Sequence, residues 1–288
     1  MSEIETHELD VPGARIAYDV RGALRSGETP LLMIGSPMDA TGFTTLATHF
    51  TDRTVVTYDP RGAGRSVRTD ATGESTPDEH ASDLHHLIDA LGAGPVDIFA
   101  SSGGAVNGLA LVSRHSEQVR TLVAHEPPLS DQLPDKAVIN AACEDIHSTY
   151  QKHGMGPAMA KFIKIVMHQG PLPESYTSEP APDPAQFGLP TEDDGSRDDV
   201  LLGQNIRTCT SYVPDYDALS ASSTRVVIAY GTESGEELAS RGGRAIARRL
   251  GLEPVEFPSG HAGFLGGEYG QQGDPDAFGP RLREVLGY

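Results

Sequence analysis

The chain has 288 residues, enough for one large α/β domain, and its 41 Asp and Glu residues outnumber 22 Lys and Arg, giving a formal net charge of −19 at pH 7. A surface this acidic repels phosphate groups, which argues against nucleic acid and membranes as partners. The opening residues MSEIETHELDVPG lack the basic and apolar regions of a secretory signal, and no apolar run is long enough to span a membrane. We therefore expect a cytoplasmic protein whose two cysteines, Cys143 and Cys209, are reduced thiols.

Short runs rich in β-branched and apolar residues recur along the chain and predict strands. In order, they are RIAYDV, PLLMIG, TVVTYD, VDIFA, VRTLVAHE, RVVIAYG and PVEFP. Helical patterns separate most of them, and the clearest begins with a capping box formed by Thr76 and Glu79 around Pro77. The last helix starts at Asp274 and Pro275. Near-continuous apolar strands between helices are typical of an α/β fold with a mostly parallel central sheet flanked by helices.

The alternation of strands and helices is interrupted between residues 129 and 219. Two helical patterns, a proline-rich loop and a third helical pattern, RDDVLLGQNIRTC, fill this segment. We therefore predict a core formed by residues 1–128 and 220–288 and a helical insertion, after the sixth strand of the fold, formed by residues 129–219. Because ligands bind at the carboxyl edge of parallel sheets, we expect the insertion to be a lid over that edge. A helical layer without a gating role is the alternative.

The stretch IFASSGGAVNG joins a predicted strand to a predicted helix and contains two serines. Ser102 has small residues two positions before and after it, Ala100 and Gly104, as a sharp strand-to-helix elbow requires. Ser101 would have a phenylalanine in the first of these positions, which is too large. Ser102 is therefore the candidate nucleophile, and the N–H group of Gly103 is a candidate donor to an oxyanion. Taken alone, the pattern also fits a glycine-rich helix start.

Three further segments complete a pattern. LLMIGSPMDATGF turns at Gly35 after a strand, VVTYDPRGAGRS follows the next strand, and VEFPSGHAGFLGG carries His261 on a loop after the last strand. Together with the elbow, these segments resemble the α/β-hydrolase fold family in order and spacing, over roughly residues 8–128 and 220–288. The resemblance implies a Ser-His-acid triad in which Ser102 is the nucleophile and His261 is the general base.

The oxyanion turn of that family usually carries His before its Gly, whereas Ile34 stands there in this chain. The donor is a backbone N–H group, so the change of side chain does not obviously harm the oxyanion hole. Pro37 has no N–H group to donate. The resemblance therefore implies Ser36 and Gly103 as the two oxyanion-hole donors.

The triad acid is the open position. The family commonly has it three residues after the glycine that ends the penultimate strand, and in YGTES that residue is Ser234, which carries no charge. Glu233 is one residue away from that position. Glu126 ends the strand after the elbow, where certain haloalkane dehalogenases of the family carry their acid, and a carboxylate after a buried strand needs a partner. We predict Glu126 as the acid and keep Glu233 as the alternative.

The helices of the insertion carry apolar side chains suited to lining an acyl pocket. The predicted lining residues are Met38, His125, Met159, Phe162 and Val166, with a packing role as the alternative for His125. EHASDLHHL lacks the histidine spacing of a zinc helix, TEDDGSRDD lacks positions of a calcium loop, and RGAGRS lacks the third glycine of a dinucleotide site. We therefore predict neither a metal nor a cofactor.

These features predict a serine hydrolase of the carboxylesterase type that cleaves a small to medium, fairly apolar ester through an acyl-enzyme. The same residues are compatible with a lactone, a thioester or a C–C bond as substrate. The alternative from another class is a non-catalytic ligand-binding protein of the same fold, which the uncharged Ser234 favours and the presence of Ser102 and His261 opposes. The sequence leaves the oligomeric state open, a homodimer included.

Overall fold

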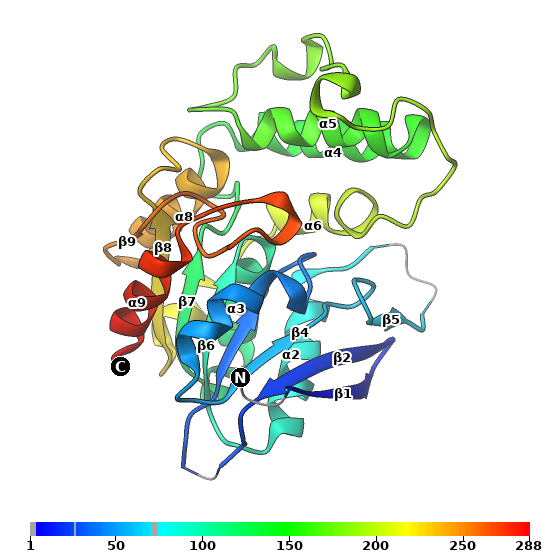
Figure 1. Cartoon of the computed structure of the whole chain (residues 1–288). Coiled ribbons are helices and arrows are strands. Elements are labelled where there is room, and N and C mark those ends of the chain that lie inside the picture. Colours follow the sequence, from blue (N-terminus) through cyan, green and yellow to red (C-terminus); the bar gives the residue numbers. More distant parts are fainter. Residues whose placement is uncertain (1–3, 26, 71–73) are drawn as a thin grey trace.

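The computed structural model describes residues 4–25, 27–70 and 74–288, so seven residues of the predicted core lie outside it. The described residues form one large sheet in the order β1-β2-β4-β3-β6-β7-β8-β9, and β5 pairs with β2 (Figure 1). The strands are β1 (Ile4–Val11), β2 (Ala14–Arg21), β3 (Leu31–Ile34), β4 (Val55–Tyr58), β5 (Val67–Arg68), β6 (Val96–Ser101), β7 (Val119–His125), β8 (Arg225–Gly231) and β9 (Val255–Phe257). Neighbours from β4 through β3, β6, β7 and β8 to β9 pair in parallel, whereas β1 and β4 flank β2 antiparallel. The predicted α/β fold with a mostly parallel sheet is confirmed.

Two strands, β1 and β5, are absent from the sequence prediction. Every residue of β1 before Val11 is at least partly exposed, so the strand has no apolar run or alternation to reveal it. β5 has only two residues. The helical insertion consequently follows the seventh strand of this chain, β7, and not the sixth.

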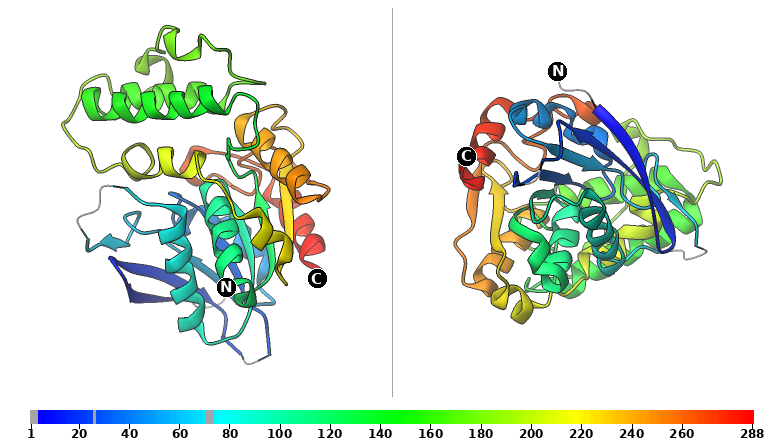
Figure 2. Two further views of the ribbon diagram at one scale, coloured as in Figure 1. Left: turned by 180° about the vertical axis from the view of Figure 1, so that it is seen from behind. Right: turned by 90° about the horizontal axis from the view of Figure 1, so that it is seen from below.

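Helices cover both faces of the sheet and bury two separate apolar clusters. They are α1 (Thr44–Ala47), α2 (Pro77–Leu91), α3 (Gly103–His115), α7 (Tyr216–Ala221), α8 (Leu238–Leu250) and α9 (Pro275–Leu286). Successive residues of a strand face opposite layers: Ile98 packs with α2 and α3, and Phe99 packs with α1 and α9. The view from below in Figure 2 shows red α9 across the sheet from the cyan and green helices α2 and α3. No helix in the described ranges is long and apolar enough to cross a membrane.

The helix starts predicted from capping residues are confirmed. The Thr76 hydroxyl accepts from the N–H of Glu79 at 3.2 Å, and the Glu79 carboxylate accepts from the N–H of Thr76 at 2.8 Å. At α9, the Asp274 carboxylate accepts from the N–H of Ala277 at 3.1 Å. These bonds satisfy backbone donors that the first helical turn leaves free.

The segment between β7 and β8 contains α4 (Lys136–His153), α5 (Met155–Val166), a π-helical turn at Leu201–Asn205 and α6 (Ile206–Thr210). Figure 1 shows α4 and α5 above the carboxyl ends of the parallel strands, with α6 between them and the sheet. The predicted helix RDDVLLGQNIRTC begins only after Asp199, whose carboxylate accepts from the N–H of Leu202 at 2.7 Å. α7 spans the predicted boundary at residue 219 and packs on α3 of the core.

A buried ion pair joins the insertion to α8. Arg241 donates to both carboxylate oxygens of Asp135, at 2.5 and 3.1 Å, and to the carbonyl oxygen of Gly170 at 2.9 Å. Asp135 also accepts from the N–H of Leu172 at 2.8 Å. Burial favours the neutral carboxyl, but the bonds from Arg241 and Leu172 outweigh it and lower the pKa of Asp135. One carboxylate therefore fastens the segment before α4 and the segment after α5 to the core.

Replacing Arg241 by Met is expected to lower the free energy of unfolding by about 3–5 kcal/mol, because Asp135 would stay buried without its cation. Urea denaturation followed by circular dichroism measures the change. Arg244→Met on the same helix is the control, since Arg244 pairs with the exposed Glu236 and such pairs contribute about 0–1 kcal/mol. Equal losses in the two variants would contradict an anchoring role for the buried pair.

Candidate active site

The turn between β6 and α3 carries Ser102 in a strained conformation. Its φ of 56° and ψ of −124° lie in a region where residues other than glycine are rare. The Ser102 N–H donates to the carbonyl oxygen of His125 at 2.9 Å, which fixes the turn against the neighbouring strand. Because the chain reverses so sharply, the Ser102 side chain projects from the carboxyl edge of the sheet and lines two cavities.

The small residues around Ser102 are required by close backbone contacts. A Cβ atom on Gly104 would lie 2.5 Å from the carbonyl oxygen of Ile34, and one on Gly103 would collide with the carbonyl oxygen of Ser36. Ala100 is fully buried in the strand before the turn. The elbow therefore packs directly on the end of β3, which explains the size pattern seen in the sequence.

We expect Gly104→Ala to destabilise the fold by about 1–3 kcal/mol, because its Cβ would overpack backbone that cannot move aside. The measurement is the free energy of unfolding in urea. Gly260→Ala is the control, since a Cβ there finds its nearest neighbour at 3.6 Å, an ordinary contact. A Gly104→Ala variant as stable as Gly260→Ala would mean that the elbow can relax away from β3.

His261 lies on the loop after β9 and meets Glu126 at the end of β7. The Nδ1 atom of His261 is 2.6 Å from Oε2 of Glu126. The second carboxylate oxygen, Oε1, accepts from the N–H of Gly231 at 2.8 Å. Glu126 is fully buried and has a φ of 50°, another strained position beside the site. Both carboxylate oxygens are thus held, and the imidazole is oriented by one of them.

The charges of this pair support each other. Burial opposes ionisation of Glu126, but the hydrogen bond to His261 and the neighbouring histidines outweigh it and lower the carboxyl pKa to about 2. Burial also opposes the imidazolium, yet the bond to Glu126 and the charges of Glu126 and Glu237 raise the pKa of His261 above 6.5. An ionised Glu126 requires the proton of a neutral His261 on Nδ1, which leaves Nε2 as the basic nitrogen.

The alternative acid, Glu233, does not reach His261 through any contact in the described structure. Its side chain is exposed and accepts from the Ser259 hydroxyl at 3.4 Å. Ser234, at the family's usual acid position, is buried, and its hydroxyl helps to lower the pKa of Glu126. The carboxylate of Glu126 therefore lies beside Ser234, in the region where the sequence lacks an acid.

The turn after β3, where the sequence predicts an oxyanion donor, lies against the elbow, because the carbonyl oxygen of Ser36 is the atom that a side chain on Gly103 would meet. A contact from the insertion reaches the same turn: Nδ2 of Asn205 donates to the Ser36 hydroxyl at 3.3 Å. Sequence reasoning missed Asn205, since it belongs to a π-helical turn 169 residues away. Such turns are frequent at functional sites.

Two cavities meet at Ser102 and His261. One, of about 480 Å³, is lined by Tyr269 and is called the Tyr269 cavity. The other, of about 370 Å³ and mostly apolar, is lined by Glu237 and is called the Glu237 cavity. Met38 and Met159 line the first, whereas Phe162 and Val166 line the second.

The predicted pocket residue His125 lines neither cavity. Its side chain is fully buried among the rings of Phe99, Phe257 and Phe278, and its ring centroid lies 6.2 Å from that of His261. Burial lowers the pKa of its imidazole to about 4. β7 is buried on both faces, so the sequence could not show which layer His125 faces, and the packing alternative is the one observed.

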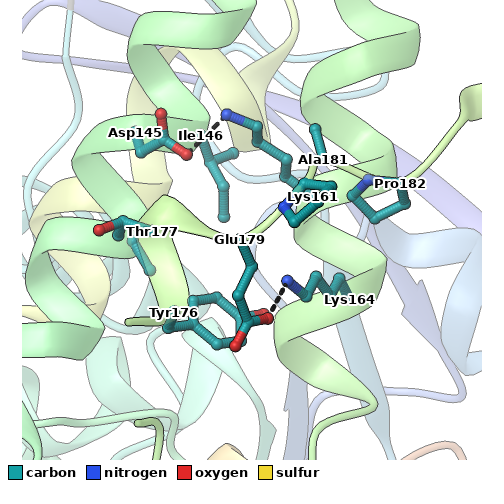
Figure 3. A pocket seen from close by; sticks show the side chains of 11 residues that line it. Asp145, Ile146, Lys161, Lys164, Tyr176, Thr177, Glu179, Ala181 and Pro182 are labelled. Atoms are coloured by element: carbon teal, nitrogen blue, oxygen red, sulfur yellow. Dashed lines mark hydrogen bonds and ion pairs between the residues drawn. The ribbon is translucent and has the colours of Figure 1, made fainter. Parts of the chain in front are cut away.

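A third, much smaller pocket lies away from Ser102, between α4, α5 and the segment 176–182 (Figure 3). Lys161 bonds Asp145 at 2.6 Å, and Lys164 bonds Glu179 at 2.7 Å. Its volume is about 20 Å³, hardly more than one water molecule occupies. The first of these ion pairs joins α5 to α4, and the second holds the segment on α5. This pocket is too small for a substrate.

Comparisons with known proteins agree with the fold of this chain. Residues 31–143 match a family model described as the alpha/beta hydrolase fold. The hydrolase YraK of Bacillus subtilis strain 168 is 32% identical over 268 residues, which cover 91% of this chain and 91% of the relative.

Solved structures extend the similarity over nearly the whole chain. An esterase from Thermogutta terrifontis has a TM-score of 0.68 and 19% identity, with 98% of each chain covered. An enol-lactonase from Burkholderia xenovorans LB400 has a TM-score of 0.68 and 17% identity, with 98% of this chain and 100% of the other covered. At these identities the similarity concerns the fold alone.

Proposed function

Because this chain belongs to the α/β-hydrolase fold family, we propose that it is a serine hydrolase that cleaves small to medium, fairly apolar carboxylic esters. The observation that carries the proposal is the 2.6 Å contact between Nδ1 of His261 and Oε2 of Glu126, beside the strained Ser102. A histidine oriented by a buried carboxylate is the base that a serine nucleophile needs.

In the acylation step, Nε2 of His261 takes the proton of the Ser102 hydroxyl while Oγ attacks the ester carbonyl carbon. The carbonyl oxygen becomes an oxyanion, which accepts from the N–H groups of Ser36 and Gly103. Collapse of this intermediate breaks the bond to the alcohol oxygen. The alcohol leaves with the proton that His261 carried, and the acyl group stays on Ser102.

In the deacylation step, a water molecule gives a proton to Nε2 of His261 as its oxygen attacks the acyl carbon. The second oxyanion accepts from the same two N–H groups. Ser102 then leaves with the proton from His261, and the carboxylic acid product loses its own proton to water. Glu126 stays ionised throughout and stabilises the imidazolium that forms in both steps.

The substrate class rests on the lining of the two cavities. Met38 and Met159 line one, and Phe162, Ile165 and Val166 line the other, so most contacts available to a substrate are apolar. Flexible Met side chains suit acyl or alcohol groups of varied shape. Volumes of about 480 and 370 Å³ fit groups of small to medium size.

The test combines labelling and turnover. The wild-type protein is treated with a fluorophosphonate probe and assayed with p-nitrophenyl esters of increasing acyl length, together with a panel of simple lactones. Labelling and ester turnover support the proposal. Labelling with turnover of lactones alone would move the substrate class toward that of the enol-lactonase neighbour. A protein that neither labels nor hydrolyses would instead be a ligand-binding member of the fold.

A further inference from the structure

The two cavities beside Ser102 differ from the usual binding sites for acids, because their charged lining is negative. The Tyr269 cavity has Asp39 and the Glu237 cavity has Glu237, and no Lys or Arg of the described residues lines either one. The Asp39 carboxylate is occupied: it accepts from the Thr41 N–H at 2.9 Å and from the Tyr269 hydroxyl at 2.8 Å. Glu237 has no comparable set of donors.

Glu237 is the residue just before α8, and its side chain is half-buried. The Glu237 carboxylate accepts one long hydrogen bond, from Nε2 of Gln169 at 3.5 Å. Within the part of the chain that the structure describes, Glu237 forms no ion pair, since the nearby Arg241 and Arg244 pair with Asp135 and Glu236. Its carboxylate acts electrostatically on both His261 and Glu126. Glu237 is thus a carboxylate without a cation, in a mostly apolar cavity, within electrostatic reach of the catalytic pair.

We propose that Glu237 is a specificity-determining residue that selects esters whose group in the Glu237 cavity is neutral or cationic and rejects groups that carry a carboxylate. This inference rests on the proposed esterase function and names the substrate class for that same site.

The physical reason is that a carboxylate entering this cavity would lose water without gaining a cation. It would also meet the charge of Glu237 across a mostly apolar space, where screening is weak. An ammonium group would meet the opposite situation, since Glu237 would offer it a counter-charge. Like-charge contacts of this kind are a common means of excluding a wrong ligand.

The experiment compares substrates that differ mainly in charge. One series varies the acyl group: p-nitrophenyl hexanoate, the p-nitrophenyl half-ester of adipic acid, and a p-nitrophenyl hexanoate that ends in trimethylammonium. A second series varies the alcohol: para-carbamoylphenyl and para-carboxyphenyl butyrate. The values of kcat/KM are measured at about pH 8, where a carboxylate with a raised pKa is still ionised. The proteins are the wild type, Glu237→Gln and, as control, Glu236→Gln, whose exposed side chain pairs with Arg244.

In at least one series we expect the wild type to prefer the neutral over the anionic ester by about tenfold or more, and Glu237→Gln to reduce that preference severalfold. Where the acyl series is the one that responds, the same variant should also lose activity toward the trimethylammonium ester. Glu236→Gln should keep the wild-type ratios in both series. A merely structural role would change all substrates alike and would not move the ratios in opposite directions.

The inference is overturned if Glu237→Gln remains folded and hydrolyses p-nitrophenyl hexanoate but keeps the wild-type charge ratios in both series. Failure of the esterase function has a different signature, because the wild type would then hydrolyse none of the esters. The series in which the ratio changes also identifies whether the acyl group or the alcohol occupies the Glu237 cavity.

Discussion

Ser102→Ala is expected to lower kcat/KM for p-nitrophenyl esters by roughly 10⁴-fold or more and to abolish labelling by a fluorophosphonate. The alanine has no oxygen to form the acyl-enzyme, so the remaining rate would come only from the oxyanion donors and from substrate binding. The variant should fold normally, because the strain at Ser102 belongs to the backbone and alanine fits the same space. Ester turnover and gel-based labelling measure the two effects.

The matched control for this variant is Ser101→Ala. Ser101 is the last residue of β6, lines the Tyr269 cavity and pairs in register with His125 of β7. It shares with Ser102 the residue type, the cavity and the neighbouring strand, but it does not occupy the elbow. If Ser102→Ala is still labelled, or if Ser101→Ala is not, then Ser102 is not the nucleophile.

The elbow could be predicted from sequence because its requirements are local. A strand, a serine and small flanking residues occur within a few positions, and the close approach of Gly104 to Ile34 shows why those positions are small. The core strands were visible for a similar reason, since β3, β4 and β6 are buried along their whole length. β1 was not predicted, because all of its residues before Val11 are at least partly exposed.

The sequence could narrow the candidate triad acid only to two residues, Glu126 and Glu233, because the choice between them depends on how separate strands align. Glu126 follows β7, and its N–H donates to Ala229 of β8, which brings its side chain to the N–H of Gly231. The sequence of a single segment does not show how β7 and β8 align. Asn205 and Glu237 were missed for a related reason, since one lies on the insertion and the other on a loop after β8, and only their packing brings them to the cavities.

Glu126→Gln is expected to lower kcat roughly 10³–10⁴-fold, whereas Glu233→Gln should leave it close to the wild-type value. The amide keeps the shape of the carboxylate and can still accept from Gly231, so folding should be preserved. It removes the negative charge that stabilises the imidazolium and that holds the proton on Nδ1 of His261. Steady-state kinetics with a p-nitrophenyl ester measures the loss, and thermal unfolding checks that the variant is intact.

The pH profile separates this role from a purely structural one. The base works as neutral imidazole, so kcat/KM rises as the pH increases through the pKa of His261, which the bond to Glu126 raises from its ordinary range. Removing the charge of Glu126 makes the imidazolium less stable, and the rising limb should therefore move to lower pH. Glu237→Gln should move it in the same direction, since Glu237 also raises that pKa. A Glu126→Gln variant with normal kcat and an unmoved profile, together with an inactive Glu233→Gln variant, would show that Glu233 is the acid and that the pair seen at 2.6 Å is not the catalytic one.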